Sequence, residues 1–500
     1  MKTEDARGLL RQLTDLRKQV QEDGAALYKT WKHDIKREAF EASAQNLAEY
    51  MALRRHDLSE LQWELIPLGL SSLGRLEARV MPTLDSVVAS CARIAGEETQ
   101  VSYHANKDFL SGEETLDHNT QEVLGPEPEK RYTRIMVTMP TEAAYNPAIA
   151  DNLVACGMEI ARINCSHDNE TLWRMMIRNV RDAAAKHRRS CRISMEIPGP
   201  KIRIDRIMTT MRKPRVVADD KIYFTGNKLM FLPGGIHLAL CCSIPEIIDY
   251  LTVGEKVLLD DGHVDTTVIE RLDDGVILKV DKVVREKGIT LRAEKGINFP
   301  GIDYKIPLLS PRDEEIMDFV CKNADIVGCS FVRDKEDVTL LLDEINKRIK
   351  KKNTMPVIIK IETSDSMRIL PEILVTAASR VPTAIMIARG DLAVEVGYAR
   401  LSELQEEILW ICEAAHVPVI WATQVVETMV KTGIPTRAEI SDVSLAAKSE
   451  CVMLNKGDHI NQAVLFVGDV LSKFEKHVYK KTAILRKLAI ASGLFEEDRL

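Results

Sequence analysis

The first hundred residues repeat apolar positions with the period of an α-helix. One set recurs at intervals of three and four residues: Leu9, Leu13, Leu16 and Val20. A second amphipathic stretch covers residues 40–53, and the alternation typical of β-strands is scarce. We therefore predict an all-α N-terminal module over residues 1–96. No residue set in it suggests chemistry, so packing or oligomerisation is its expected role.

Residues 97–131 are polar and irregular in pattern, and they contain several turn formers, as in the run GPEPEK. We interpret this range as a linker. It is the clearest boundary between the helical module and the rest of the chain.

From residue 132 a different rhythm begins, in which eight short, apolar, β-rich runs alternate with helical segments. The runs are RIMVTM (134–139), EIARIN (159–164), RISMEI (192–197), DIVGCSF (325–331), VIIKIE (357–362), AIMIAR (384–389), VPVIWA (417–422) and CVMLNK (451–456). Residues 170–186 and 311–323 are examples of the helical segments. The second of these begins with Ser310 and Asp313, a capping-box-like pair.

Eight strands that alternate with helices are the count of an α/β fold of the (β/α)8 TIM barrel type, built here from residues 132–204 and 294–480. A doubly wound open sheet is the alternative. We favour the barrel because polar or charged residues end nearly every run. Barrel enzymes place their sites at that face, the C-terminal ends of the strands.

The interval between the third and fourth runs is not one helix. It consists of short β-like segments joined by turns, such as KIYFTG and HVDTTVIERL. We predict an inserted β-barrel-like domain over residues 205–293, which can act as a lid above the barrel mouth. Asp261 lies in one of its turns.

We expect residues 481–500 to form a basic, helical tail.

The amino-acid composition argues against several classes of protein. The chain has 500 residues, of which 45% are hydrophobic and 29% charged, as in an ordinary globular protein. Its net charge of -7 argues against binding to nucleic acid or to an anionic membrane. The 10 cysteines contain no CxxC pair, and we find neither a signal peptide nor an apolar run long enough to cross a bilayer. We therefore expect reduced thiols and a cytoplasmic location.

Two neighbouring runs end abruptly in charge. One ends in Lys360 and Glu362, and the next leads into Arg389 and Asp391. Glu362 and Asp391 can hold a hard divalent cation through oxygen. A lysine and an arginine beside that cation make a pocket for phosphate or carboxylate. For any one of these residues, a helix cap or a solvated loop charge is the alternative interpretation.

If the strand ends converge on one barrel mouth, further side chains share it: Arg162, Asn164, Ser166, Arg203 and Thr423. Phosphate-binding arginines, a metal pair and a lysine suit phosphoryl transfer through a metal-bridged anion. The helix after Gly390 can present free N–H groups to an anion. Neither a Walker A motif nor a Rossmann fingerprint is present, so nucleotide binding by those loops is excluded.

At these residues the sequence resembles the pyruvate kinase family. The matching segments are ARINCSHD (161–168), GPKIRI (199–204), LLDDGHV (258–264), KGINFPGID (295–303), CSFVRDKEDV (329–338), IKIET (359–363), MIARGDLAVEVG (386–397), WATQVVETM (421–429) and PTRAEISDV (435–443). The resemblance covers about residues 132–458, with the insertion at the family's place. It implies a barrel with a β lid, which agrees with the pattern above. The helical module is an addition that most members lack.

The resemblance implies a role for each matching residue around the substrate. Glu362 and Asp391 would hold the divalent ion, Mg2+ or Mn2+, that bridges phosphoenolpyruvate. Lys360 would neutralise the phosphoryl group in flight. The N–H groups of Gly390 and Asp391, with the Thr423 hydroxyl, would hold the substrate carboxylate. Thr423 would also lie near the enolate carbon that is protonated.

Further matches concern phosphates, the lid and a monovalent cation. Arg162 and Arg203 would contact phosphates, and with Asn164 they would bind the nucleotide. Asp261 would close over the site from the lid. The family's monovalent-cation site would leave a remnant: Asn164, Ser166 and Lys201.

Departures from the family pattern concern potassium and regulation. Where the family usually has an Asp-Thr-Lys run before GPEIR, this chain has Glu196, Ile197 and Pro198. Ile197 offers no hydroxyl. Lys201 stands where potassium-dependent members carry a glutamate, so its ammonium would replace the mobile cation. We therefore predict that potassium is not required. The family's C-terminal regulatory domain has no counterpart, so we expect no control by a sugar bisphosphate bound there.

The predicted function is transfer of the phosphoryl group from phosphoenolpyruvate to ADP, giving pyruvate and ATP in glycolysis. Residues 138–143 and 455–458 depart from the family on the nucleotide side. They motivate a second hypothesis, in which the same enolate chemistry uses another acceptor or none. A third is a non-catalytic phosphoenolpyruvate sensor that acts through the helical module, although Lys360 counts against it. The expected partners are phosphoenolpyruvate, ADP or ATP and further copies of the chain in a homo-oligomer.

Overall fold

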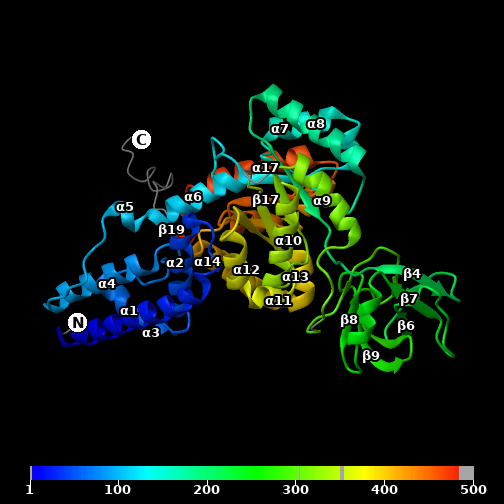
Figure 1. The fold of residues 1–500 in the computed structure, drawn as a ribbon, viewed down its shortest axis with the longest axis horizontal. Helices are drawn as coiled ribbons and strands as arrows, with labels where there is room; N and C mark the ends of the chain where they lie inside the picture. Colours follow the sequence, from blue (N-terminus) through cyan, green and yellow to red (C-terminus); the bar gives the residue numbers. More distant parts are fainter. Residues whose placement is uncertain (1–2, 303, 350–353, 484–500) are drawn as a thin grey trace, which may run out of the picture.

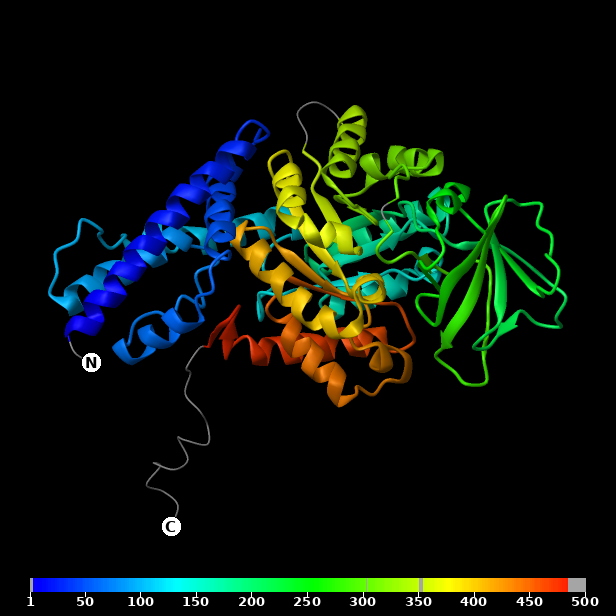
Figure 2. The same ribbon diagram turned by 90° about the horizontal axis from the view of Figure 1, so that it is seen from below.

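The computed structural model describes residues 3–302, 304–349 and 354–483. Three parts follow one another along its longest axis (Figure 1). A helical arm from the N-terminal residues lies at one end, the barrel lies in the middle, and the inserted β domain lies at the other end. The view from below likewise shows the arm and the inserted domain on opposite sides of the barrel (Figure 2).

The eight predicted strands form a closed parallel barrel in the order β1-β17-β16-β15-β14-β13-β3-β2. Their bounds are β1 Arg134–Thr138, β2 Ile160–Asn164, β3 Arg192–Ile197, β13 Ile326–Cys329, β14 Val357–Ile361, β15 Thr383–Ala388, β16 Val419–Ala422 and β17 Cys451–Leu454. Strand β1 pairs with both β17 and β2, which closes the sheet. The barrel is confirmed, and the open-sheet alternative is wrong. Helices cover the outer face of the barrel, so its strands are buried on both faces. This burial explains why the runs are apolar at nearly every position.

The helices between the strands agree with the pattern. They are α7 Pro147–Cys156, α8 Glu170–His187, α9 Pro311–Asn323, α10 Lys335–Arg348, α11 Ser364–Arg368, α12 Leu370–Ala378, α13 Arg389–Val396, α14 Tyr398–Ala414, α15 Glu427–Thr432, α16 Arg437–Ala446 and α17 Ile460–Phe474. Helix α9 begins with the predicted capping box, in which Ser310 and Asp313 satisfy each other's backbone N–H groups. The sequence therefore fixes where this helix starts.

The insertion after β3 forms a seven-stranded sheet in the order β12-β8-β9-β10-β6-β7-β4. Its strands are β4 Ile204–Thr209, β6 Lys221–Thr225, β7 Leu238–Cys242, β8 Lys256–Leu259, β9 Val264–Leu272, β10 Gly275–Val283 and β12 Ile297–Asn298. It has its own apolar core, separate from the barrel's. Two short backbone segments connect it to the barrel, one around Arg203 and the other around Gly296, and we call them the lid stem. Arg203 and Gly296 form an isolated antiparallel β-bridge between the two segments.

The N-terminal arm contains α1 Thr3–Trp31, α2 Glu41–Leu53, α3 Ser59–Leu65 and α4 Val80–Ala95. The apolar positions that predicted the first helix are buried in it: Leu9, Leu13, Leu16 and Val20. Helix α1 packs against α2 and α4, and α2 packs against α14 of the barrel. The all-helical prediction is therefore confirmed.

The interpretation of residues 97–131 as an irregular linker needs a correction. This range contains α5 Asn106–Phe109 and the longer α6 Ser111–Leu124. Val123 and Leu124 at the end of α6 belong to the apolar cluster that fills the barrel, together with Met136 and Ile358. Helix α6 forms because its few apolar residues share one face that the barrel buries, although the range as a whole is polar.

Buried polar contacts attach the arm to the C-terminal end of α14. The His416 ring lies between Ser43 Oγ, 2.9 Å from Nδ1, and the Ala78 carbonyl, 2.9 Å from Nε2. Burial lowers the pKa of His416 to about 4, so the ring is neutral at physiological pH. Asn46 donates to the Ala414 carbonyl at 2.8 Å. Gly112 of α6 lies so close that a Cβ atom there would be 1.9 Å from the Ala78 oxygen.

Two further predictions concern the chain as a whole. Every cysteine lies in the described part of the chain, and none forms a disulfide. Within the described ranges, no helix is long and apolar enough to span a bilayer. A short hairpin, β18 Val478–Tyr479 with β19 Thr482–Ala483, follows α17. Most of the predicted tail over residues 481–500 lies outside the described residues.

Candidate active site

The C-terminal ends of the barrel strands meet at a mouth next to the inserted domain. Arg162 lies on β2 and Lys360 on β14, while Thr423 directly follows β16. Glu362 follows β14 by one residue, and Asp391 lies in the first turn of α13. The parallel barrel therefore gathers these predicted side chains from sequence positions that are far apart.

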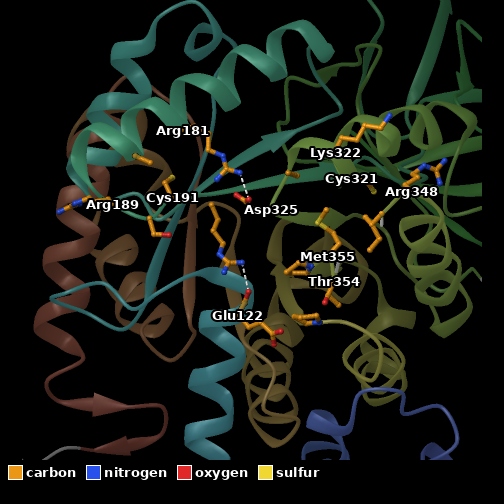
Figure 3. A pocket seen from close by; sticks show the side chains of 17 residues that line it. Glu122, Arg181, Arg189, Cys191, Cys321, Lys322, Asp325, Arg348, Thr354 and Met355 are labelled. Carbon is orange, nitrogen blue, oxygen red and sulfur yellow. Dashed lines mark hydrogen bonds and ion pairs between the residues drawn. The ribbon is translucent and has the colours of Figure 1, made fainter. Parts of the chain in front are cut away.

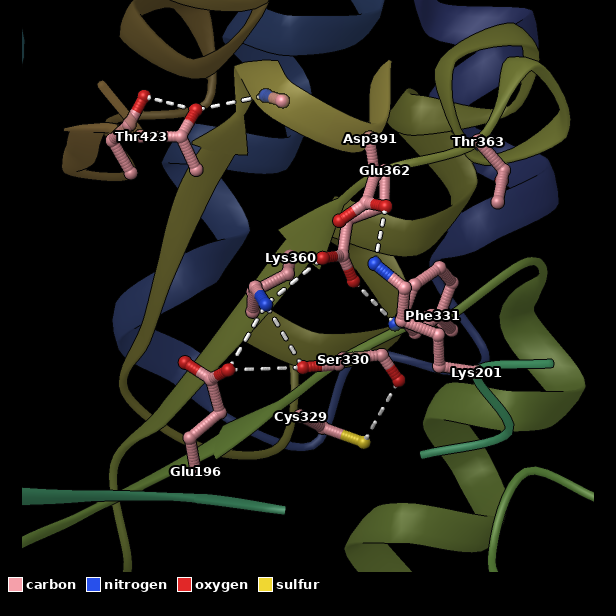
Figure 4. A network of polar contacts seen from close by, with 12 residues as sticks. Glu196, Lys201, Cys329, Ser330, Phe331, Lys360, Glu362, Thr363, Asp391 and Thr423 are labelled. Carbon is pink, nitrogen blue, oxygen red and sulfur yellow. Dashed lines mark hydrogen bonds and ion pairs between the residues drawn. The ribbon is translucent and has the colours of Figure 1, made fainter. Parts of the chain in front are cut away.

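Glu196, at the end of β3, is the centre of a buried charge network. Its carboxylate accepts two hydrogen bonds from the Arg162 guanidinium, both at 2.7 Å. The Lys360 ammonium donates to it at 3.0 Å (Figure 4). Burial alone would raise the pKa of Glu196, but the two cations hold it well below its usual range. Glu196 is therefore a fixed carboxylate anion.

The Lys360 ammonium has two further partners. It donates to Ser330 Oγ at 2.9 Å, and it lies 2.9 Å from Glu362 Oε1. Burial alone would lower the pKa of Lys360, yet Glu196 and Glu362 raise it above its usual value. The barrel mouth thus holds a permanently charged ammonium whose position is set from three sides.

Glu362 and Asp391 lie next to each other, as Figure 4 shows. Glu362 is almost completely buried, and its second oxygen accepts a 2.6 Å hydrogen bond from the Phe331 N–H. Burial raises the pKa of Glu362, and the negative charge of Asp391 raises it further. Two carboxylates that repel each other in a buried site are a suitable donor set for a hard cation.

The donor set fits a divalent ion that keeps waters or substrate oxygens in its remaining positions. Within the described residues, no group of three or more His, Cys, Asp or Glu side chains could enclose a metal alone. Mg2+ is commonly held by one or two carboxylates and completed by substrate phosphate. Glu362 and Asp391 would therefore be its protein ligands.

Thr423 and Gly390 form a second polar centre at the mouth. The Gly390 N–H donates to Thr423 Oγ1 at 2.8 Å, and this hydroxyl donates to the Ala422 carbonyl, also at 2.8 Å. Thr423 has a φ of 62°, which is unusual for a β-branched residue. Arg389 stabilises this backbone by donating to the Thr423 carbonyl at 2.8 Å and by pairing with Asp442. Strained backbone held in this way is common at functional sites.

The inserted domain reaches the mouth through Asp261. Its carboxylate lies 3.4 Å from the Lys201 ammonium, which in turn lies 2.7 Å from Asp391. Gly262 is close to α13, since a Cβ atom there would be 3.3 Å from Val394. The lid residue predicted from the sequence therefore faces the proposed metal ligands.

Other predicted residues have no hydrogen bond or ion pair with Lys360, Glu362 or Asp391 in the described structure, apart from Lys201. Arg203 donates to the Glu294 carbonyl at 2.8 Å in the lid stem. Asn164 accepts a hydrogen bond from the Ser166 N–H at 3.0 Å. Within the described structure, the polar contacts of Lys201 go to Asp391 and Asp261, and none goes to Asn164 or Ser166. The predicted remnant of a monovalent-cation site is thus not assembled around Lys201.

Sequence reasoning missed two members of the network. Ser330 directly follows β13 and contacts both Lys360 and Glu196, the latter at 3.1 Å. Its position after an apolar run was the same signal that identified Lys360. Glu196 was noted only as a departure from the family, because its partners are 34 and 164 residues away.

Two cavities differ in their relation to this chemistry. One of about 280 Å³ adjoins the network on the β1–β2 side, and its lining includes Thr138, Arg162, Asn164, His167, Asp168, Glu427 and Lys456. A larger one of about 1090 Å³ lies at the opposite end of the barrel, where Arg181 pairs with Asp325 at 2.6 Å (Figure 3). The larger cavity contains no predicted site residue. Of these two cavities, only the small one is lined by predicted site residues, Arg162 and Asn164.

Comparisons with known proteins agree with this geometry. Residues 130–462 match the family model of the pyruvate kinase barrel domain. A pyruvate kinase of Thermotoga maritima is 29% identical over 365 residues, which is 72% of this chain and 73% of that protein. The Thermococcus litoralis pyruvate kinase is 31% identical over 350 residues, with 69% of each chain covered. The pyruvate kinase of Corynebacterium efficiens is 31% identical over 338 residues, and this match covers 65% of each chain.

A crystal structure of a pyruvate kinase from Cryptosporidium parvum superposes with a TM-score of 0.62 at 28% sequence identity. The match covers 72% of this chain and 73% of that one. The family model begins at residue 130, so the helical arm and α6 lie before the matched region.

Proposed function

Because the chain belongs to the pyruvate kinase family, we propose that it transfers the phosphoryl group of phosphoenolpyruvate to ADP, giving pyruvate and ATP in glycolysis. The observation that carries this proposal is the Lys360 ammonium. It is buried beside the carboxylate pair, and Glu196, Ser330 and Glu362 fix its position. A fixed cation in a site with little water stabilises the charge that develops on a phosphoryl group during transfer.

The other residues would position the substrate. Glu362 and Asp391 would hold Mg2+ or Mn2+, which when bound neutralises phosphate charge and holds substrate oxygens. The first turn of α13 would offer the N–H groups of Gly390 and Asp391 to the substrate carboxylate. The Thr423 hydroxyl, held by Gly390, would face the enolate carbon and supply its proton.

The cavity next to Arg162 is the proposed place for the nucleotide. Asn164 also lines it, and the Arg162 guanidinium lies between this cavity and Glu196. Arg203 would reach the phosphates from the lid stem. Another acceptor is the second candidate, because the acidic Asp168 and Glu427 line the same cavity. A homo-oligomeric state and a cytoplasmic location stay predictions.

We also propose that the reaction does not require potassium. Glu196 lies at the sequence position of the family's usual aspartate, and here two fixed cations, Arg162 and Lys360, neutralise it. Ile197 provides no hydroxyl for a monovalent ion. A mobile cation would therefore add positive charge where the protein already provides it. The Lys201 ammonium brings a further positive charge to the mouth.

The test is a coupled assay with phosphoenolpyruvate, ADP and Mg2+, with and without potassium. We expect pyruvate and ATP to form equally well in both, and Lys360→Met to lose about a thousandfold in kcat. Lys186→Met is the matched control, because the exposed Lys186 of α8 pairs with Asp151 of α7, away from the barrel mouth. If the wild type exchanges the methyl protons of pyruvate but forms no ATP, the acceptor is not ADP.

A further inference from the structure

Helix α6 ends inside the N-terminal end of the barrel, where the strands begin. Val123 and Leu124, which we call the tip of α6, are completely buried in the apolar cluster that fills the barrel. Two arginines at the starts of barrel strands hold this tip through its carbonyl oxygens. Arg134 of β1 donates to the Gly125 carbonyl at 3.1 Å, and Arg192 of β3 donates to the Val123 carbonyl at 3.2 Å. Because the C-terminal end of a helix carries partial negative charge, these guanidiniums stabilise its place in the barrel.

Apolar side chains from several barrel strands pack with the tip. Met136 of β1, Ile160 of β2 and Ile358 of β14 belong to the same buried cluster as the tip. Successive residues of a strand point to opposite faces of the sheet. Their neighbours Val137 and Ile359 accordingly belong to a different cluster, together with residues of the covering helices. Met136, Ile160 and Ile358, which we call the middle layer, therefore face the barrel interior.

The buried charge network is the next layer of the barrel interior. Thr138, Arg162 and Lys360 lie two residues beyond the middle layer on the same three strands, so they point to the same side. Arg162 donates to Thr138 Oγ1 at 2.9 Å, and Arg162 and Lys360 share the Glu196 carboxylate. A strand rises about 3.3 Å per residue, which separates the two layers by about 7 Å along each strand. The tip of α6 is therefore one layer of side chains away from Lys360.

We propose that Val123 and Leu124 are positioning residues, which act through the middle layer to hold Lys360 and Arg162 in place for phosphoryl transfer. The inference deepens the proposed function and rests on it for the catalytic role of Lys360. Protein interiors are close-packed, so a void under Ile358 lets the strand and its next inward side chain shift. Phosphoryl transfer depends on accurate placement of charge, and a displacement of about 1 Å is costly. The family match begins at residue 130, so a helix outside the matched barrel supports its active site.

The experiment compares two completely buried leucines in the full chain. Leu124→Ala removes side-chain atoms next to the middle layer, whereas Leu13→Ala removes the same atoms where α1 packs against the other helices of the arm. Each variant is assayed at a temperature where circular dichroism shows it folded. For Leu124→Ala we expect kcat of the coupled assay to fall about tenfold, while the KM for phosphoenolpyruvate stays within about twofold of the wild-type value. Leu13→Ala should keep the wild-type kcat.

Two further variants test whether the filled space under the middle layer is the cause. Leu124→Met keeps nearly the volume of leucine and should restore most of kcat. Val123→Ala makes a smaller void at the same tip and should lower kcat less than Leu124→Ala does. It keeps the test available if Leu124→Ala does not fold.

Amide hydrogen exchange supplies a readout without turnover. Exchange at residues 357–361 of β14 should accelerate in Leu124→Ala and not in Leu13→Ala, because only the first void lies beneath this strand. A folded Leu124→Ala with wild-type kcat overturns the proposal, as does an equal loss of kcat in Leu13→Ala or unchanged exchange at residues 357–361. An inactive wild type in which Leu124→Ala alone accelerates this exchange would contradict the proposed function and leave the support of β14 by α6 standing.

Discussion

Two parallel hydrogen bonds of 2.7 Å join the guanidinium of Arg162 on β2 to the carboxylate of Glu196 on the adjacent β3. Lys360 approaches the same carboxylate at 3.0 Å, so one buried anion faces two buried cations. Each charge is stable in the barrel only because the others are present. The network therefore fixes the position of Lys360, and its charges depend on one another for folding.

Glu196→Gln should destabilise the fold by about 3–5 kcal/mol, because it leaves Arg162 buried without its counter-charge and leaves Lys360 with Glu362 alone. Urea unfolding at neutral pH measures the change. Glu315→Gln is the control: Glu315 pairs with Arg312 on the surface of α9 at 2.9 Å, and loss of such an exposed pair costs at most about 1 kcal/mol. Equal costs for the two variants would show that Glu196 is not the centre of the network.

Thr423→Val should lower kcat and the exchange of pyruvate methyl protons by about a hundredfold. Valine has the shape of threonine but no hydroxyl, so the Gly390 N–H loses its partner and the proposed proton donor is removed. Thr423→Ser keeps the hydroxyl and should retain most of the activity. A valine variant that exchanges methyl protons at the wild-type rate would exclude Thr423 as the proton donor.

Much of the barrel was predictable because each strand is a short apolar run that can be identified from its own residues. The run at 357–361 is apolar apart from Lys360, which lies where the strand reaches the mouth. Charge at a strand end thus predicted which side chains meet at the barrel mouth. Ser330 followed the same rule and was missed only because a serine after a strand is also an ordinary loop residue.

The partners of these charges were not predictable from the sequence. Lys201 and Asp391 are 190 residues apart and meet only because the lid stem returns to the barrel mouth. Helix α6 was missed for a related reason. Its apolar face is sparse, with Leu116, Val123 and Leu124 among polar residues, and it is stabilised by the barrel interior that buries it.

Gly112→Ala should destabilise the attachment of the arm by about 1–3 kcal/mol, since the added Cβ atom would lie 1.9 Å from the Ala78 oxygen and 2.7 Å from the His416 ring. Thermal unfolding and limited proteolysis of the arm measure the effect. Gly8→Ala is the matched control, because Gly8 lies in α1 with open space around its Cβ position. That variant should gain about 0.5–1 kcal/mol from helix propensity. Equal effects of the two substitutions would argue against a close contact at Gly112.

His416 should make the stability of the protein depend on pH. Burial lowers its pKa to about 4 from the ordinary 6.5, so the unfolded chain binds a proton that the folded ring does not. Stability from this group is complete above pH 6.5 and is lost as the pH falls toward 4. Between pH 8 and pH 5 the loss should be about 2 kcal/mol.

Glu413 acts in the opposite direction over the same range, because burial raises its pKa to about 7 and its protonation favours the folded state at lower pH. The test is therefore a difference between wild type and His416→Gln, with urea unfolding at pH 8 and pH 5. The variant loses the hydrogen bonds to Ser43 and Ala78 at both pH values, which shifts its stability but not its slope. The wild type should lose about 2 kcal/mol more than the variant on acidification. Parallel pH profiles would mean that His416 stays uncharged in the unfolded chain or is protonated in the folded one.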